Sequence, residues 1–172
     1  MSKLQPFLEL KAQVIADRQH DFTENPAKAL GQLSARSWVG GITGTRPIRM
    51  GEYTIISDSG PGLGGNSLGP TSPELLLGAL ASCLVHTYLI QAALLDIPLD
   101  QVEIEVKAEL DYAPVIGLPT ALPPQLRTIR YEPKVSSPAS AERIEAMHKA
   151  VEVSCPVLNT LRLPSPVERI YQ

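Results

Sequence analysis

The sequence predicts an α+β fold, and three of its segments carry that prediction. Residues 75–95 form an uncharged apolar run that is long enough for a central helix. Residues 102–110 alternate apolar and charged side chains, as in a strand with one buried face. Residues 35–57 hold short aromatic and β-branched runs that glycines interrupt, which indicates a meander of two or three strands. The chain has 172 residues, of which 44% are hydrophobic and 19% charged, and this composition is typical of one globular unit.

The first 34 residues are expected to form a helical extension that precedes the globular domain of residues 35–172. Apolar residues recur at helical spacing over residues 3–18, which indicates an amphipathic helix. Residues 23–26 then offer a capping residue and an early proline, which favours a second short helix through Leu33. Charged side chains interrupt the start of the chain and exclude a secretory signal, so we expect a cytoplasmic protein.

The loop of residues 59–73 contains five glycines and three prolines, and part of it imitates a nucleotide-binding motif. Gly60 to Gly65 satisfy the pattern GxGxxG after a predicted strand. However, the next helix is expected to start near Glu74 rather than on the glycines, and Pro61 lacks an amide that a phosphate could use. We therefore expect no dinucleotide cofactor.

The apolar run of residues 75–95 is also long enough to span a bilayer. Four polar side chains interrupt it, and the nearest cations are as distant as Arg49 and Lys107. The absence of flanking positive charge favours a helix at the core of the fold, apolar nearly all round, over a membrane span.

The second half of the chain is expected to return to the sheet. Four prolines in residues 113–124 indicate an extended loop or flap before a strand over residues 126–131. The segment from Ser137 to Ser140 starts another helix, which ends before Pro156, and residues 167–171 are expected to complete the sheet.

The charge balance and the two cysteines limit the classes of function. Fifteen basic and eighteen acidic side chains give a formal net charge of −3, so we expect no nucleic-acid partner. Cys83 and Cys155 are too far apart for a CxxC motif and too few for a four-ligand zinc site. In a reducing compartment such cysteines are catalytic, redox-sensing or simply buried thiols.

Cys83 alone has two interpretations. It is either a small apolar residue of the core or a reactive thiol, and the polar side chains of His86 and Thr87 on its own helix face favour the second. A metal site made of Cys83, His86 and Cys155 is a further alternative, because zinc accepts sulfur and imidazole ligands.

Two motifs resemble the OsmC/Ohr family of organic hydroperoxide reductases. The stretch GPTSPELLLGALASC ends at Cys83 and is similar to the family's first cysteine motif, and VSCPVLNTL around Cys155 is similar to the second. FTENPAKAL and RMGEYTIISDSGPGLGG also look like one OsmC branch, so the resemblance extends over nearly the whole chain. It implies an OsmC-like fold, with an antiparallel sheet packed on a long buried central helix, and an intertwined homodimer.

The resemblance also implies site residues. It makes Cys83 the peroxidatic thiolate and Cys155 the resolving thiol, and it places an activating arginine on an early strand, where Arg49 is the preferred match and Arg46 the second. A family glutamate pairs with that arginine. Glu74 follows Pro73 as in the family but lies one residue closer to the cysteine, so it either reaches the arginine or only complements the helix N-terminus.

Two further candidates stand beside this pattern. Arg36 is a third possible match for the arginine, and His86, which the family pattern does not contain, either tunes a local pKa or faces solvent in a groove.

The implied activity is a thiol-dependent peroxidase that reduces organic hydroperoxides through a Cys83 sulfenic acid and a Cys83–Cys155 disulfide. It requires no cofactor, only an external dithiol reductant of the lipoyl or thioredoxin type. The alternative function is a non-catalytic redox-sensing or small-ligand-binding module on the same fold. No membrane partner is expected.

Overall fold

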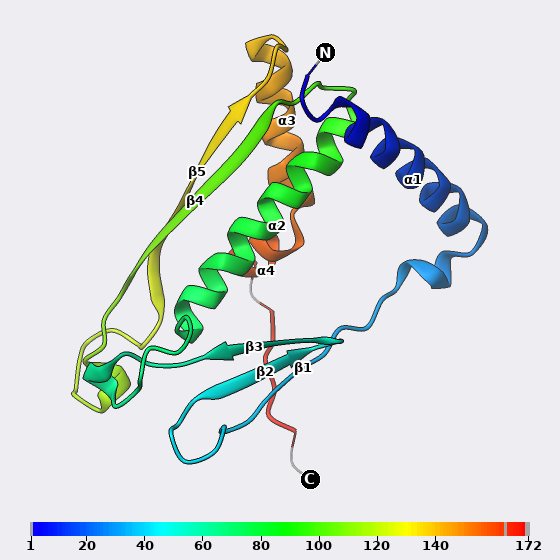
Figure 1. Ribbon diagram of the computed structural model, residues 1–172. Helices are drawn as coiled ribbons and strands as arrows, with labels where there is room; N and C mark the ends of the chain where they lie inside the picture. Colours follow the sequence, from blue (N-terminus) through cyan, green and yellow to red (C-terminus); the bar gives the residue numbers. More distant parts are fainter. Residues whose placement is uncertain (1, 164, 171–172) are drawn as a thin grey trace. The chain divides into compact units, whose positions relative to one another are not determined.

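The computed structural model describes residues 2–163 and 165–170, which combine helices with two small antiparallel sheets (Figure 1). The chain forms two compact units. One consists of Met1–Arg18 with Ala79–Gln172, and the other is Gln19–Gly78. The division into 1–34 and 35–172 that the sequence suggested stays a prediction, although these compact units divide the chain at other positions.

The N-terminal helix α1 (Gln5–Glu24) is longer than predicted: its first turn tolerates Pro6, and neither glycine nor proline follows before Pro26. Its start belongs to the larger unit. The Leu4 N–H donates to the Leu99 carbonyl at 3.1 Å, and Leu8 is buried in the core. The second predicted helix starts at Pro26 as expected but is a 3-10 helix that ends at Ala29 rather than at Leu33, since Gly31 lies two residues further on and disfavours a helix.

The smaller unit contains the predicted meander, which is confirmed as three strands. β1 (Ala35–Ser37), β2 (Arg46–Met50) and β3 (Tyr53–Ser57) form one antiparallel sheet in the order β1-β2-β3. Arg46 lies opposite Ser57 and Met50 opposite Tyr53, so two residues connect β2 to β3. Gly51 takes a positive φ of 58° there, as tight hairpins require.

A buried carboxylate organises the glycine-rich loop that follows β3. Asp58 accepts hydrogen bonds from the backbone N–H groups of Ser59, Asn66 and Leu68, at 2.8, 2.9 and 3.2 Å. These bonds, chiefly that from Asn66, hold the pKa of Asp58 below its usual range. The loop is therefore an ordered turn around one carboxylate rather than a phosphate cradle.

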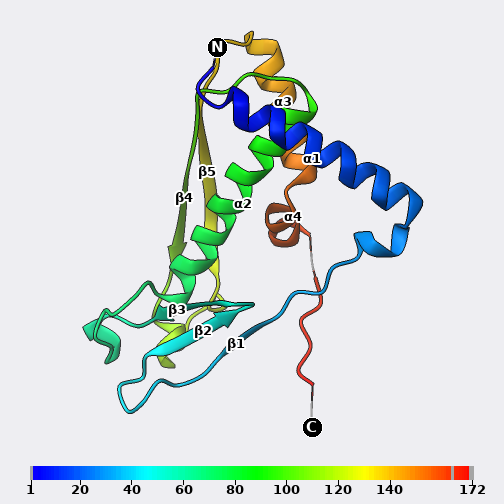
Figure 2. The ribbon, with the colours of Figure 1, turned by 45° about the vertical axis from the view of Figure 1, so that its right-hand side comes forward.

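Helix α2 (Ser72–Leu94) is the predicted central helix. In the larger unit, the hairpin of β4 and β5 runs alongside it (Figures 1 and 2), and its buried residues meet the core residues of α3. Its length and composition are also those of a membrane span, with a mean hydropathy of 1.6. That is weak support for a span, because core helices share both properties, and the predicted absence of a membrane stays a prediction. Only 28% of its most apolar stretch is buried by this chain.

The hairpin consists of β4 (Gln101–Leu110) and β5 (Leu126–Ser136). In β4, half-buried apolar side chains alternate with exposed polar ones, which confirms the predicted alternation. β5 continues five residues beyond its predicted end, past Pro133, because in a two-stranded ribbon one side of each strand makes no ladder bonds. The connecting loop contains the 3-10 turn Pro114–Ile116.

The two C-terminal helices meet at Cys155. The predicted helix is α3 (Ala141–Ser154), with Ser140 as its N-cap, and α4 (Pro156–Arg162) follows directly. Sequence analysis missed α4, since Pro156 was interpreted only as a terminator, whereas proline also suits the first turn of a helix. The predicted closing strand is wrong for residues 167–170, where the exposed Val167 and Ile170 pair with no strand; Tyr171 lies outside the described residues.

Candidate active site

The two cysteines, 72 positions apart in sequence, lie side by side in the structure. The Sγ atoms of Cys83, on α2, and Cys155, between α3 and α4, are 3.5 Å apart, and both thiols are free. Cys155 is fully buried, with 0% of its surface exposed, while Cys83 is half-buried. A disulfide needs a sulfur separation of about 2.05 Å. A small approach of the two side chains therefore suffices to join them.

The surroundings of Cys83 favour its neutral thiol. Burial raises the pKa of Cys83, and the adjacent Cys155 raises it further. The backbone N–H of Val157 and the hydroxyl of Thr87 act in the opposite direction. The Thr87 hydroxyl donates to the Cys83 carbonyl at 2.8 Å, so its single proton serves the sulfur only after it rotates.

Cys83 lies on a polar stripe of the otherwise apolar helix α2. Residues 83, 87 and 91 follow one another at helical spacing along α2, and Gln91 Nε2 donates to the Ser154 hydroxyl at 3.1 Å. The stripe thus connects α2 to the end of α3, directly before Cys155. Sequence analysis placed His86 and Thr87 on the face of Cys83 but counted Gln91 only as a polar interruption of the apolar run, although its i+8 spacing from Cys83 was a readable signal.

Beside this stripe, a second polar pair also connects α2 to α3. The hydroxyl of the buried Tyr88 lies 2.5 Å from His148 Nδ1, so the two side chains share a hydrogen bond whose direction depends on the histidine tautomer. Burial raises the pKa of Tyr88. Sequence analysis did not single out either residue, because their partnership spans 60 positions.

His86 lies on an exposed part of α2. Its Nε2 is 3.4 Å from Nζ of Lys11 on α1, and a lysine ammonium can only donate to it. Within the residues that the structure describes, no group of three or more His, Cys, Asp or Glu side chains could hold a metal ion. The geometry therefore gives the metal alternative no support.

The three candidate arginines belong to the sheet of the smaller unit. Arg46 donates to the hydroxyls of Ser57 and Ser59, both at 3.4 Å, and its charge contributes to lowering the pKa of Asp58. Arg49 is exposed, and its Nε donates to the Gly51 carbonyl at 3.2 Å. Arg36 on β1 lies directly opposite Arg49 on β2, so two cationic side chains are cross-strand neighbours in the sheet.

Glu74 occupies the first turn of α2, where it forms a capping box with Thr71. Its carboxylate accepts from the N–H and the hydroxyl of Thr71, both at 2.7 Å, and the Glu74 N–H lies 3.4 Å from the Thr71 hydroxyl oxygen. These bonds lower the pKa of Glu74, chiefly that from the Thr71 N–H. The structure therefore shows the capping contact; a contact with an arginine stays a prediction.

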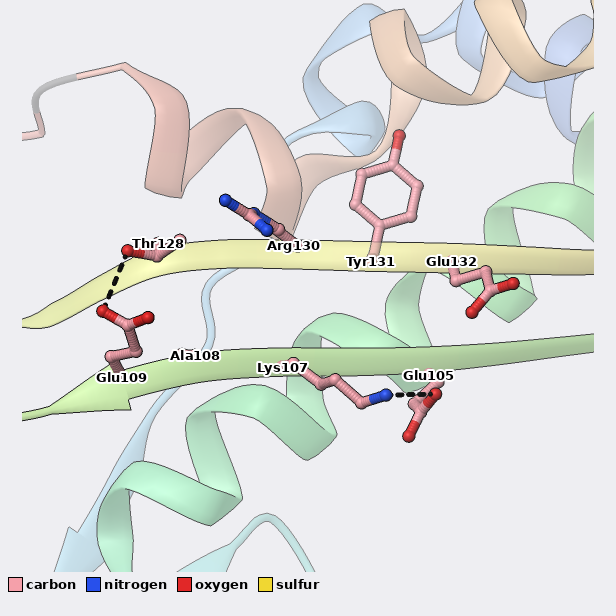
Figure 3. A pocket seen from close by; sticks show the side chains of 8 residues that line it. All are labelled: Glu105, Lys107, Ala108, Glu109, Thr128, Arg130, Tyr131 and Glu132. Atoms are coloured by element: carbon pink, nitrogen blue, oxygen red, sulfur yellow. Dashed lines mark hydrogen bonds and ion pairs between the residues drawn. The ribbon is translucent and has the colours of Figure 1, made fainter.

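Open hollows lie on the larger unit, and two of them are lined mostly by residues with charged or polar side chains. One, of about 410 Å³, lies over the charged face of the hairpin (Figure 3), where Lys107 pairs with Glu105 at 3.0 Å and the Thr128 hydroxyl donates to Glu109 at 3.2 Å. The other, of about 700 Å³, is bounded by β5, α3 and α4. Neither cysteine lines these two hollows, so neither hollow leads to the sulfur pair.

Comparison with known proteins identifies the family. Residues 64–169, well over half of the chain, match the family model described as OsmC-like protein. The chain therefore belongs to the OsmC-like family, as its two cysteine motifs indicated. A search of curated proteins finds no match.

Solved structures of low sequence identity share this fold. An OsmC-like protein from Mycoplasma pneumoniae is 21% identical with a TM-score of 0.66, over 77% of this chain and 88% of that one. An osmotic stress induced and detoxification response protein from Psychrobacter arcticus is 16% identical with a TM-score of 0.60, over 76% and 89%. An organic hydroperoxide resistance protein from Legionella pneumophila is 19% identical with a TM-score of 0.55, over 77% and 90%. At these identities the likeness shows the fold alone, and it confirms the predicted α+β class.

Proposed function

We propose that this protein reduces organic hydroperoxides with Cys83 as the attacking thiolate and Cys155 as the resolving thiol. The observation that carries the proposal is the 3.5 Å separation of one half-buried and one fully buried sulfur. Membership of the OsmC-like family supports it, as do structural neighbours that are themselves called organic hydroperoxide resistance proteins.

The proposed cycle conserves atoms and electrons at each step. The Cys83 thiolate attacks one peroxide oxygen, the O–O bond breaks, and the alcohol leaves after it takes a proton, so Cys83 becomes a sulfenic acid. The Cys155 thiol then attacks the Cys83 sulfur, and water leaves as the disulfide forms. An external dithiol supplies two electrons and two protons to restore both thiols, and it becomes a disulfide itself.

Because the two cysteines are buried to different extents, dissolved substrates can reach one sulfur and not the other. Cys155 is fully buried, so a peroxide can reach only the half-buried Cys83. For the same reason the dithiol reductant attacks Cys83 in the disulfide, and Cys155 leaves as the thiolate. Cys155 thus reacts only with Cys83, and neither the peroxide nor the dithiol reductant contacts it.

Activation of Cys83 requires a cation, because burial raises the pKa of its thiol and only the thiolate attacks. Arg49 remains the preferred candidate and Arg46 the second. This order is supported because Arg46 bonds two serine hydroxyls and its charge acts on Asp58, whereas Arg49 bonds the Gly51 carbonyl through Nε alone and lies opposite Arg36. Two like charges opposite each other are unfavourable in a sheet, and a nearby anion such as a thiolate relieves their repulsion.

A second copy of this chain is the proposed partner that covers α2. Large apolar side chains such as Leu76 and Leu94 remain exposed on this helix, and 28% of its most apolar stretch is buried by the chain itself. A homodimer in which two such helices meet removes this surface from water. The proposed setting is the cytoplasm, where a lipoyl-type or thioredoxin-type dithiol keeps the cysteines reduced.

Intact mass spectrometry after one equivalent of cumene hydroperoxide tests the cycle. The reduced protein should lose two hydrogens and both alkylatable thiols, whereas Cys155→Ser should gain one oxygen instead. Two unreacted thiols in the unsubstituted protein refute the proposed activity.

The raised pKa of Cys83 also favours a second function, a redox-sensing or ligand-binding module that does not turn over. A neutral thiol reacts slowly with peroxides, yet the adjacent Cys155 still permits a slow, reversible disulfide. Steady-state peroxide consumption with a dithiol separates the two functions, because a sensor undergoes oxidation once without sustained turnover.

A further inference from the structure

The side chain of Asn159, on α4, bonds the corner of the chain that carries Cys155. Its Nδ2 donates to the carbonyls of Val153 and Cys155, both at 2.9 Å, and lies 3.3 Å from the carbonyl of Glu152. One carboxamide thus joins the last turn of α3 to the first turn of α4 (Figure 1 shows the two helices meeting). Cys155 lies between them.

The carbonyls of Glu152 and Val153 need a donor because the backbone does not supply one, whereas that of Cys155 also accepts from the Asn159 N–H at 3.0 Å. In a continuing helix, Glu152 would accept from the N–H of residue 156, but that residue is Pro156, which has no N–H. Val153 would accept from the N–H of Val157, but that N–H acts on the Cys83 thiol instead, whose pKa it lowers. The Asn159 amide replaces both missing donors.

We propose that Asn159 is a positioning residue for the thiol pair. By bonding the α3 carbonyls it holds Cys155 at the corner, within reach of Cys83, and leaves the Val157 N–H directed at the Cys83 sulfur. Its value for catalysis rests on the proposed peroxidase function. Its effect on the geometry of the two sulfurs does not, and that effect is measurable in the absence of any peroxide.

Redox equilibrium with glutathione tests the proposal. Glutathione disulfide takes two electrons and two protons from the Cys83 and Cys155 thiols, and the equilibrium gives the effective concentration of one thiol at the other. Asn159→Ala should lower this effective concentration about tenfold, the order expected when a hydrogen bond that orders one state is lost. Asn159→Asp, which has the same shape but directs an acceptor at three carbonyls, should lower it more.

The matched control is Thr160→Ala. The Thr160 hydroxyl donates to the Pro156 carbonyl at 2.8 Å, so this variant also loses a side-chain bond to the backbone of α4, but none to α3. Its effective concentration should equal that of the unsubstituted protein. If Asn159→Ala matches this control, the proposal is wrong. If Asn159→Asp does not fold, Asn159→Ala alone decides.

A second measurement separates positioning from general stability. In a Cys155→Ser background, the pH dependence of Cys83 alkylation should move to higher pH in Asn159→Ala, because the Val157 N–H is no longer held toward the sulfur. An unchanged pH dependence contradicts the proposal. The proposed function fails by a different result: peroxide leaves the thiols of the unsubstituted protein unreacted.

Discussion

Oxidation of Cys83 and Cys155 to a disulfide should stabilise the fold by an amount that the structure lets us calculate. The two residues enclose a loop of 72 positions, and their sulfurs are already 3.5 Å apart. The chain-entropy relation then gives about 4 kcal/mol of stabilisation at 25 °C, all of it from constraint of the unfolded chain. For a chain of this length, this corresponds to a rise in Tm of roughly 12 °C.

Chemical denaturation of the oxidised and reduced protein, at one protein concentration, measures this difference. Cys155→Ser is the control, since it cannot form the disulfide and should not gain this stabilisation on oxidation. A shift well below 4 kcal/mol means that joining the sulfurs strains the native state. An oxidised form no more stable than the reduced one refutes the inference that the cysteines are prepared to pair.

Three further predictions concern the smaller unit. Arg49→Ala should raise the pKa of Cys83 and slow its alkylation at pH 7, because burial then acts without the cation; an unchanged pH profile of alkylation excludes Arg49 as the activator. Glu74→Gln should leave Tm nearly unchanged, because glutamine also completes a capping box, so a loss of peroxide turnover in this variant indicates a contact with the arginine. Gly65→Ala should lower Tm strongly, since its Cβ would lie 2.0 Å from the Ser59 carbonyl oxygen, while Gly62→Ala, with no atom within 4 Å, should have little effect.

Most helices and strands were predictable because their signals are local. The apolar run around Cys83 and the alternation of residues 102–110 each specify one element by its own periodicity. The predictions failed where one residue has two structural uses. Pro156 follows the end of α3 and also begins α4. Pro26 begins a helix, as expected, but Gly31 follows so closely that only one 3-10 turn forms.

The candidate site was predictable in part. The resemblance of two motifs singled out both cysteines, and the structure brings their sulfurs together. Gln91 and Asn159 were missed because their partners, Ser154 and the carbonyls of α3, become neighbours only when helices pack or meet at a corner. The buried carboxylate of Asp58 was missed for a similar reason, since its three N–H donors are spread over a loop of ten residues.

The sequence by itself determined most of the elements, the cysteine motifs and the family that they indicate, because periodicity and short motifs depend on neighbours along the chain. Only the tertiary structure decided which sulfur is buried and which is exposed, that burial raises the pKa of Cys83, and that one side chain of α4 replaces the donors missing at the end of α3. Burial and hydrogen bonding depend on which distant segments pack together, and no local pattern of residues contains that information.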